Sequence, residues 1–250
     1  MHETFENQFL IRSSETDVSG FCRPSVLLSL MQDVANDHSA LQGSSRDVLM
    51  EKHGAFWMLV RIWLRLDRPI RQDETLTVRT WQRGPDKVMV YRDFDLFVGP
   101  ELVGEAVTAW VVADFESRRM LRPNSIPEIV DSPPPETVKD RVLRPIRSPK
   151  ERTEIYRRTV RYSDLDVNGH MNNTRYADLA MDAFTPEELA GRFLSELHLN
   201  YSMECRAGET ILVCRAELEG GWYAEGCGPD GGKRFESILR FSPLDKAGDS

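Results

Sequence analysis

Apolar residues recur with a helical period in two stretches of the chain, and both stretches follow a short polar segment. In each stretch the apolar positions are spaced i, i+3, i+4, i+7 and i+8, which is typical of an amphipathic helix that buries one face. The first set is Leu27, Leu30, Met31, Val34 and Ala35, and the second is Tyr176, Leu179, Ala180, Ala183 and Phe184. Pro24 suits the first turn of the earlier helix and Gly43 its end, so we predict a helix over residues 24–43.

After each helix the apolar residues alternate with polar ones at a period of two, which predicts antiparallel strands separated by Gly/Pro turns. The strands expected in the first half cover residues 60–66, 75–81, 88–98 and 105–115. Those expected in the second half cover residues 197–201, 210–217, 222–226 and 234–241. Each half therefore has a strand, a long helix and a meander of antiparallel strands, which is an α+β arrangement.

The two halves are copies of one unit. Residues 11–20 align without a gap with residues 160–169, and five of these positions are identical. The same offset along the sequence also aligns the two sets of apolar helix positions. Between the copies, residues 131–152 begin with a run of prolines, which predicts a stiff linker. We therefore predict an N-terminal domain over residues 1–130, this linker, and a C-terminal domain over residues 153–250.

Composition narrows the classes of protein. The chain has 250 residues and a net charge of -8, which argues against non-specific binding to nucleic acid or to an acidic membrane. Its apolar runs are far shorter than the roughly 20 residues that span a bilayer. The first residues resemble no secretory signal, and the four cysteines show no Cys-x-x-Cys spacing. We therefore expect a cytoplasmic protein with free thiols and no structural zinc.

Candidate chemistry is concentrated just before the second helix. Asp166, Asn168 and His170 alternate along the chain, so in an extended segment they project from one side. Asn172 and Asn173 follow at the helix start, where backbone amides favour an anionic or polarised oxygen. One alternative is a partly buried histidine bonded to the helix start. Another is a metal site begun by Asp166 and His170, but a third ligand at suitable spacing is missing, so we predict no metal.

Several spaced motifs resemble the acyl-ACP thioesterase family, the plant and bacterial enzymes that release fatty acids from acyl carrier protein (ACP). The resemblance covers nearly the whole chain. Its motifs are Trp57 with Arg61, Thr80-Trp81, Arg92-Asp93, Trp110-Val111, Ser117-Arg118-Arg119, Ile126-Pro127, the segment 164–173, and Tyr201-x-x-Glu204-Cys205. It implies a tandem double hotdog fold, in which each half is a long helix wrapped by an antiparallel β-sheet.

The resemblance also implies the reaction, which is hydrolysis of a fatty acyl-ACP thioester in fatty acid biosynthesis without a cofactor. The implied catalytic set is Asp166, Asn168, His170 and Glu204. An older view of the family makes the cysteine at position 205 a nucleophile. We favour Glu204 as the base that activates water, because Cys205 is more often a small buried side chain.

The repeat provides an internal control for this assignment. Ser19, Phe21 and Pro69 stand opposite Asn168, His170 and Glu204, and none of those three supplies the chemistry. We therefore expect one active site per chain and an N-terminal half that binds the acyl group. The residues expected to contact substrate are Leu27, Met31, Trp57, Asn172 and Asn173.

An acidic enzyme needs a local positive surface to recruit an acidic carrier. From residue 139 to residue 161 there are nine Lys/Arg and three Asp/Glu residues. Within this basic stretch, the residues expected to dock the carrier are Arg141, Arg144, Arg147 and Lys150. The alternatives are a merely solvated linker, or a dock that uses Arg61, Arg65, Arg118 and Arg119.

Two other functions remain open from the sequence: an acyl-CoA thioesterase of the hotdog superfamily and a non-catalytic acyl-binding hotdog protein. The sequence leaves acyl chain length and oligomeric state open as well, with a homodimer among the alternatives.

Overall fold

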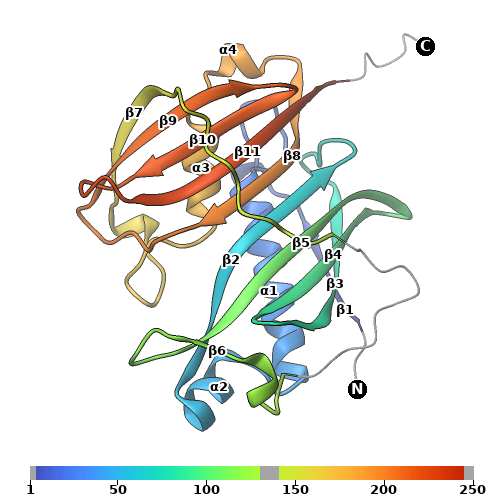
Figure 1. Cartoon of the computed structure of the whole chain (residues 1–250). Coiled ribbons are helices and arrows are strands. Elements are labelled where there is room, and N and C mark those ends of the chain that lie inside the picture. The colour runs from blue at the N-terminus through green and yellow to red at the C-terminus, as the bar shows by residue number, and fades with distance from the viewer. Residues whose placement is uncertain (1–3, 130–140, 245–250) are drawn as a thin grey trace.

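The computed structural model describes residues 4–129 and 141–244, and it shows two halves built from the same order of elements (Figure 1). The elements of the first half are β1 (Phe5–Leu10), α1 (Pro24–Leu41), α2 (Arg46–His53), β2 (Ala55–Leu66), β3 (Thr75–Asp86), β4 (Met89–Val98), β5 (Glu101–Asp114) and β6 (Met120–Leu121), with 3-10 turns at Ser13–Glu15 and Pro123–Ser125. Those of the second half are β7 (Thr153–Thr159), a 3-10 turn at Tyr162–Asp164, α3 (Arg175–Met181), α4 (Pro186–Leu189), β8 (Arg192–Tyr201), β9 (Thr210–Leu218), β10 (Gly221–Cys227) and β11 (Lys233–Pro243).

The strands form one antiparallel sheet in the order β1-β3-β4-β5-β2-β8-β11-β10-β9-β7, with β6 added beside β5. The order is symmetric about its centre. Strands β1, β3, β4, β5 and β2 of the first half correspond to β7, β9, β10, β11 and β8 of the second. The halves therefore meet at β2 and β8, where Trp63 pairs with His198. These two residues occupy equivalent positions in their halves, so a local twofold axis passes between them. The tandem α+β arrangement predicted from the sequence is confirmed.

Equivalent loops of the two halves have the same backbone shape. Each contains two isolated bridges: Thr16 to Cys22 and Phe21 to Arg71 in the first half, and Leu165 to Met171 and His170 to Arg206 in the second. Gly20 and Gly169 have φ angles of 77° and 74°, a left-handed conformation that glycine adopts without strain. The internal repeat is therefore structural as well as sequential.

The two helices differ more than the repeat predicts. Helix α1 has 18 residues and buries its apolar stripe against the inner face of the sheet, whereas α3 has only seven. Pro186 disfavours a helical conformation at Thr185, and the Thr185 side chain instead accepts a hydrogen bond from the amide of Glu188 to cap α4. The long second helix that we predicted is therefore wrong in length, although Phe184 beyond it is still buried.

One apolar core serves both halves. It includes Leu27 and Met31 of α1, Leu179 of α3, and strand residues from each side of the junction, such as Ile62 and Leu197. Burial of such a core is the main stabilising contribution to a fold of this kind. Within the described residues no helix is both long enough and apolar enough to cross a membrane.

Residues 141–152, the described part of the predicted linker, cross the outer face of the sheet at the junction of the halves; we call this segment the strap (Figure 1). Leu143 and Ile146 of the strap are buried. The Ser148 hydroxyl donates to Glu236 at 2.6 Å, and Arg152 pairs with Glu225 at 2.6 Å. The strap is therefore packed against the sheet rather than free. Residues 131–140 of the predicted linker lie outside the described residues.

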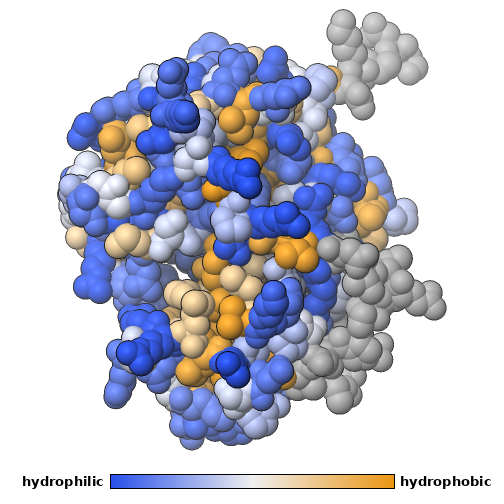
Figure 2. Space-filling view, viewed as in Figure 1, coloured by the Kyte–Doolittle hydropathy of each residue, from blue (hydrophilic) through white to orange (hydrophobic). Residues whose placement is uncertain are grey.

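Figure 2 shows mainly hydrophilic residues along the middle of this face, where the strap lies, and apolar surface below it over β2 and β5. The strap thus turns most of its polar side chains outward while Leu143 and Ile146 face the sheet; Val142 is also exposed.

Candidate active site

The carboxylate of Asp166 shapes the loop that carries the candidate residues. Its Oδ1 accepts hydrogen bonds from the amides of Asn168 at 2.8 Å and His170 at 3.4 Å. Its Oδ2 accepts one from Nδ2 of Asn168 at 3.3 Å. Asp166 therefore positions both following residues.

His170 and Glu204 are brought together although they are far apart in the sequence. Strand β8 ends at Tyr201 and the chain turns back, so that the amide of Met171 donates to the carbonyl of Cys205 at 2.9 Å. This contact places Nε2 of His170 3.3 Å from Oε2 of Glu204. The His170 side chain is 15% exposed and that of Glu204 is 45% exposed, so water reaches the carboxylate.

Cys205 points the other way, into the core. Its side chain is buried, and its amide donates to the hydroxyl of Tyr176 at 3.2 Å. Burial raises the pKa of the Cys205 thiol to about 11. Because the thiolate is the nucleophilic form, this cysteine is poorly suited to covalent catalysis near neutral pH.

Two arginines of the first half reach the candidate residues of the second half. Nη2 of Arg46 donates to Oδ1 of Asn168 at 2.5 Å, and Nη1 of Arg118 lies 3.7 Å from Oε1 of Glu204. Sequence reasoning missed Arg46 because it missed helix α2. The signals were Ser45, which caps this helix, and Gly54, which ends it.

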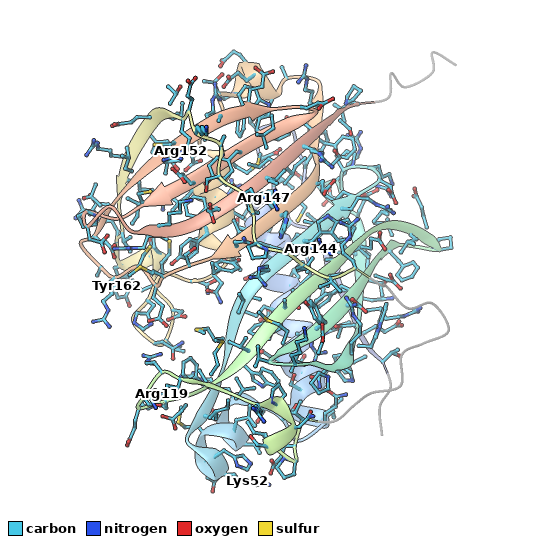
Figure 3. The ribbon with its side chains drawn as sticks, viewed as in Figure 1. Lys52, Arg119, Arg144, Arg147, Arg152 and Tyr162 are labelled. Atoms are coloured by element: carbon cyan, nitrogen blue, oxygen red, sulfur yellow. The ribbon has the colours of Figure 1, made fainter. Side chains whose placement is uncertain are left out.

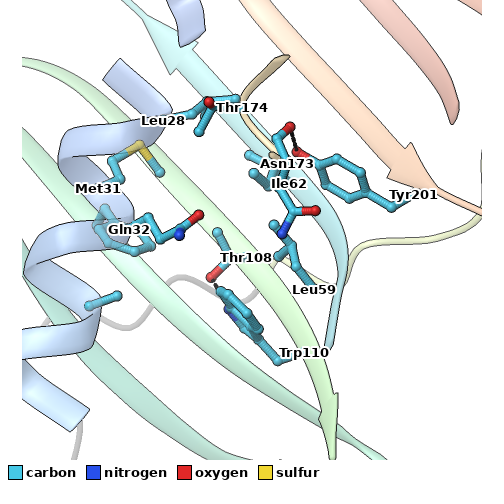
Figure 4. A pocket seen from close by; sticks show the side chains of 12 residues that line it. Leu28, Met31, Gln32, Leu59, Ile62, Thr108, Trp110, Asn173, Thr174 and Tyr201 are labelled. Atoms are coloured by element: carbon cyan, nitrogen blue, oxygen red, sulfur yellow. Dashed lines mark hydrogen bonds between the residues drawn. The ribbon is translucent and has the colours of Figure 1, made fainter. Parts of the chain in front are cut away.

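A pocket opens between α1 and strands β2 and β5, and residues 173, 174 and 201 of the second half complete its lining (Figure 4). None of Asp166, Asn168, His170 and Glu204 is among its lining residues. About 300 Å³ not filled by atoms lies between its lining residues, a figure that includes open solvent. Its lining residues are Leu28, Met31, Gln32, Ala35, Leu59, Ile62, Phe94, Thr108, Trp110, Asn173, Thr174 and Tyr201. At one end Nε1 of Trp110 donates to the hydroxyl of Thr108 at 2.9 Å, which fixes the indole against the sheet.

Only two of the five predicted substrate contacts, Met31 and Asn173, line this pocket. Leu27 packs in the core, and Nε1 of Trp57 donates to the carbonyl of Ser44 at 2.9 Å. Oδ1 of Asn172 accepts from the amide of Thr174 at 3.0 Å. Leu27, Trp57 and Asn172 therefore do not line this pocket, and their contact with substrate stays a prediction.

The amides near Asn172 are also less available than the sequence suggested. The amide of Asn172 donates to the carbonyl of Asp164 at 2.8 Å, and the amide of Arg175 donates to the carbonyl of Asn172 at 2.9 Å. With the Thr174 amide bonded to the Asn172 side chain, three amides at this helix start are already engaged. These three amides are therefore not free to bind a polarised oxygen.

The four predicted docking residues, Arg141, Arg144, Arg147 and Lys150, are all exposed. Figure 3 shows Arg144 and Arg147 on the strap. The guanidinium of Arg141 lies 3.5 Å from the centroid of the Trp63 ring and is partly engaged there. No other described residue forms an ion pair with Arg144, Arg147 or Lys150. Across residues 4–129 and 141–244, no three His, Cys, Asp or Glu side chains gather in a way that would hold a metal ion.

Comparison with known proteins places this geometry in a family. Residues 2–131 match the acyl-ACP thioesterase N-terminal domain, and residues 147–230 match the acyl-ACP thioesterase C-terminal domain. The chain is 29% identical over 254 residues to a chloroplastic palmitoyl-acyl carrier protein thioesterase of Cuphea hookeriana, which covers 95% of this chain and 59% of that relative. It thus spans well under two thirds of this curated relative's length.

Solved structures agree on the fold. An acyl-ACP thioesterase from Bacteroides thetaiotaomicron superimposes with a TM-score of 0.83 at 22% identity, covering 96% of this chain and 98% of that one. The 12:0-ACP thioesterase from Umbellularia californica gives a TM-score of 0.81 at 20% identity, covering 98% of this chain and 99% of that one. The fold is that of the hotdog thioesterases. The domain matches then show that this chain belongs to the acyl-ACP thioesterase family.

Proposed function

We propose that the protein hydrolyses fatty acyl-ACP thioesters to free fatty acid and holo-ACP. The observation that carries this proposal is the contact between His170 and Glu204, on chain segments that also line a pocket made largely of apolar residues. The chain segments that carry His170 and Glu204 also contribute residues to the pocket. Asn173 and Tyr201 line the pocket, and the Tyr201 hydroxyl donates to the carbonyl of Asn173 at 3.0 Å.

In the proposed reaction Glu204 takes a proton from water as the water oxygen attacks the thioester carbonyl carbon. His170 orients Glu204 through Nε2. When the carbon–sulfur bond breaks, Glu204 returns the proton to the leaving thiolate, either directly or by way of His170. A thiolate leaves readily because its conjugate acid has a pKa of roughly 8.5 in free cysteine.

Asn168 is the proposed donor to the thioester oxygen. An amide nitrogen carries two hydrogens. One of those on Nδ2 of Asn168 is used by Asp166, and the other remains for the oxygen on which negative charge develops. The burial of Cys205 supports a water-activating carboxylate over a nucleophilic thiol.

We propose that the acyl chain lies in the pocket along α1. From Leu28 to Ala35 the helix rises about 10 Å at roughly 1.5 Å per residue. A fully extended acyl chain of about eight carbons spans this distance if each carbon adds about 1.3 Å, from C–C bonds near 1.5 Å. The Trp110 indole, held by its hydrogen bond to Thr108 at one end of the pocket, would then limit the length of the acyl chain.

We propose the strap as the docking surface for ACP. Its cations Arg144, Arg147 and Lys150 are exposed in a chain whose net charge is -8, so the strap offers an acidic partner a local attraction.

The function is tested by thiol release from one acyl group presented on ACP and on CoA, with Glu204→Gln as the control of strongly reduced activity. Faster turnover on ACP is the expected result. Equal or faster turnover on CoA would indicate an acyl-CoA thioesterase. An absence of thiol release from every thioester would leave an acyl-binding protein.

A further inference from the structure

Two polar contacts that join the halves at the candidate site are made by arginines. Asn168 and Glu204 belong to the second half, and each is met by an arginine from the first half, at 2.5 Å and 3.7 Å respectively. The first half carries none of the catalytic side chains, so its contribution here is of another kind.

Arg46 is held in place by its helix. It is the first residue of α2, directly after the cap at Ser45. The other end of α2 is anchored where His53 and Lys52 contact Glu128 at 2.6 Å and 3.1 Å. Hydrogen bonds from His53 and Lys52 lower the pKa of Glu128 to about 2, so this anchor stays charged at neutral pH.

Arg118 is held by aromatic rings. Its guanidinium carbon lies 5.0 Å from the ring centroid of Phe56 and 5.7 Å from that of Phe115. Its backbone has a φ of 58°, and its amide donates to the carbonyl of Asp114 at 3.0 Å. Stacking on two rings restricts the guanidinium to a small region next to Glu204.

These contacts determine the orientation of two groups in the proposed reaction. The amide of Asn168 is bound at both ends, with Oδ1 on Arg46 and one Nδ2 hydrogen on Asp166. Two contacts on one planar group fix its plane and direct the remaining hydrogen. Arg118 attracts one oxygen of Glu204 while the other oxygen contacts His170.

We propose that Arg46 and Arg118 are positioning residues, through which the first half orients Asn168 and Glu204 for catalysis in the second half. This inference rests on the proposed hydrolase function. It assigns the N-terminal half a part in the chemistry in addition to binding the acyl chain.

The test is a double-mutant cycle measured on a small acyl-pantetheine thioester, which has no carrier protein to dock. Arg46→Met is expected to lower kcat about 10-fold with KM unchanged, the size of one lost positioning contact of about 1.4 kcal/mol. Arg46→Lys, which keeps a donor, should recover part of this loss. In an Asn168→Ala background Arg46→Met should change kcat less than about twofold, since its partner is gone.

Arg118→Met is measured in the same way, alone and with Glu204→Gln. Arg122→Met is the matched control, because the side chain of this exposed arginine forms no hydrogen bond or ion pair with another described residue and its loss changes net charge equally. Thermal unfolding of each variant separates loss of activity from loss of fold.

Losses that add fully in the double variants would overturn the inference. So would equal losses for Arg46→Met and Arg46→Lys, or losses no larger than that of the Arg122 control. A rise in KM for acyl-ACP with normal turnover of the small thioester would make the arginines carrier contacts instead. If the wild type releases no thiol at all, the hydrolase proposal itself fails.

Discussion

Asp17 and Asp166 hold equivalent loops with the same pair of hydrogen bonds, although only Asp166 lies in the candidate active site. Oδ1 of Asp17 accepts from the amides of Ser19 at 2.8 Å and Phe21 at 3.1 Å. Oδ1 of Asp166 accepts from the amides two and four residues further along in the same way. The aspartate therefore has a turn-forming role that does not depend on the chemistry.

This pair separates folding from catalysis. Asp17→Ala and Asp166→Ala should each lower the free energy of unfolding by about 1–2 kcal/mol, because each removes two charge-assisted hydrogen bonds to backbone amides of a partly exposed loop. Asp166→Ala also removes the hydrogen bond from Nδ2 of Asn168. Only Asp166→Ala should also lower kcat, since it releases the Asn168 amide. Urea unfolding and thiol release measure the two effects. A comparable loss of kcat in Asp17→Ala, well below its melting temperature, would contradict the division of roles.

The neighbours Glu204 and Cys205 face opposite environments and should respond differently to truncation. Glu204→Ala should lower kcat by about 10²-fold or more, the usual consequence of losing a general base. Cys205→Ala should keep most activity, and the wild-type thiol should react slowly with iodoacetamide at pH 8 because burial holds its pKa near 11. Mass spectrometry after rapid quenching provides the check: an acyl adduct on Cys205 would reverse the assignment.

Acyl length should follow the pocket lining. Met31→Trp fills the pocket and should shift preference toward shorter chains, whereas Trp110→Ala removes the indole at one end and should allow longer ones. Leu27→Trp is the control, because Leu27 is buried in the core outside the pocket; overpacking there should lower stability by about 1–3 kcal/mol without changing the length profile.

Turnover of a series of acyl-ACPs from short to long measures these profiles. An unchanged profile in both pocket variants would mean that the acyl chain binds elsewhere.

Charge reversal on the strap should weaken carrier binding. Arg144→Glu with Arg147→Glu should raise KM for acyl-ACP, and added salt should weaken the wild type more than the variant, because salt screens an attraction that the variant has lost. Arg23→Glu with Arg192→Glu gives the same net charge at exposed sites off the strap. Steady-state kinetics at low and high salt distinguish the two pairs. Similar KM values in both variants would move the dock to other cations, such as Arg61, Arg65, Arg118 and Arg119.

The sequence predicted much of the fold because local patterns determine it. The stripe from Leu27 to Ala35 identified α1, and the aligned loops identified the repeat, down to the matching left-handed glycines at positions 20 and 169. The loop bearing Asp166, Asn168 and His170 was found for the same reason, since its chemistry lies within five consecutive residues.

What the sequence did not predict depends on long-range contacts. Helix α2 is short and only weakly amphipathic, so Arg46 was missed although it contacts Asn168 across 122 positions of sequence. The strap was predicted as a spacer because prolines indicate stiffness but not the buried positions of Leu143 and Ile146. Leu27 was expected to contact substrate because it belongs to a buried apolar face, but periodicity does not show which part of that face meets the pocket, and Leu27 does not line it.

The pairing of Trp63 with His198 has a consequence for how this molecule can change over evolutionary time. In a dimer of identical chains the two residues on the axis would have to be the same, and every substitution would appear twice. Here the two copies are separate segments of one chain, so a substitution in one copy does not appear in the other. An arginine can therefore be acquired on one side of the axis without being imposed on the other, and the two halves are free to specialise.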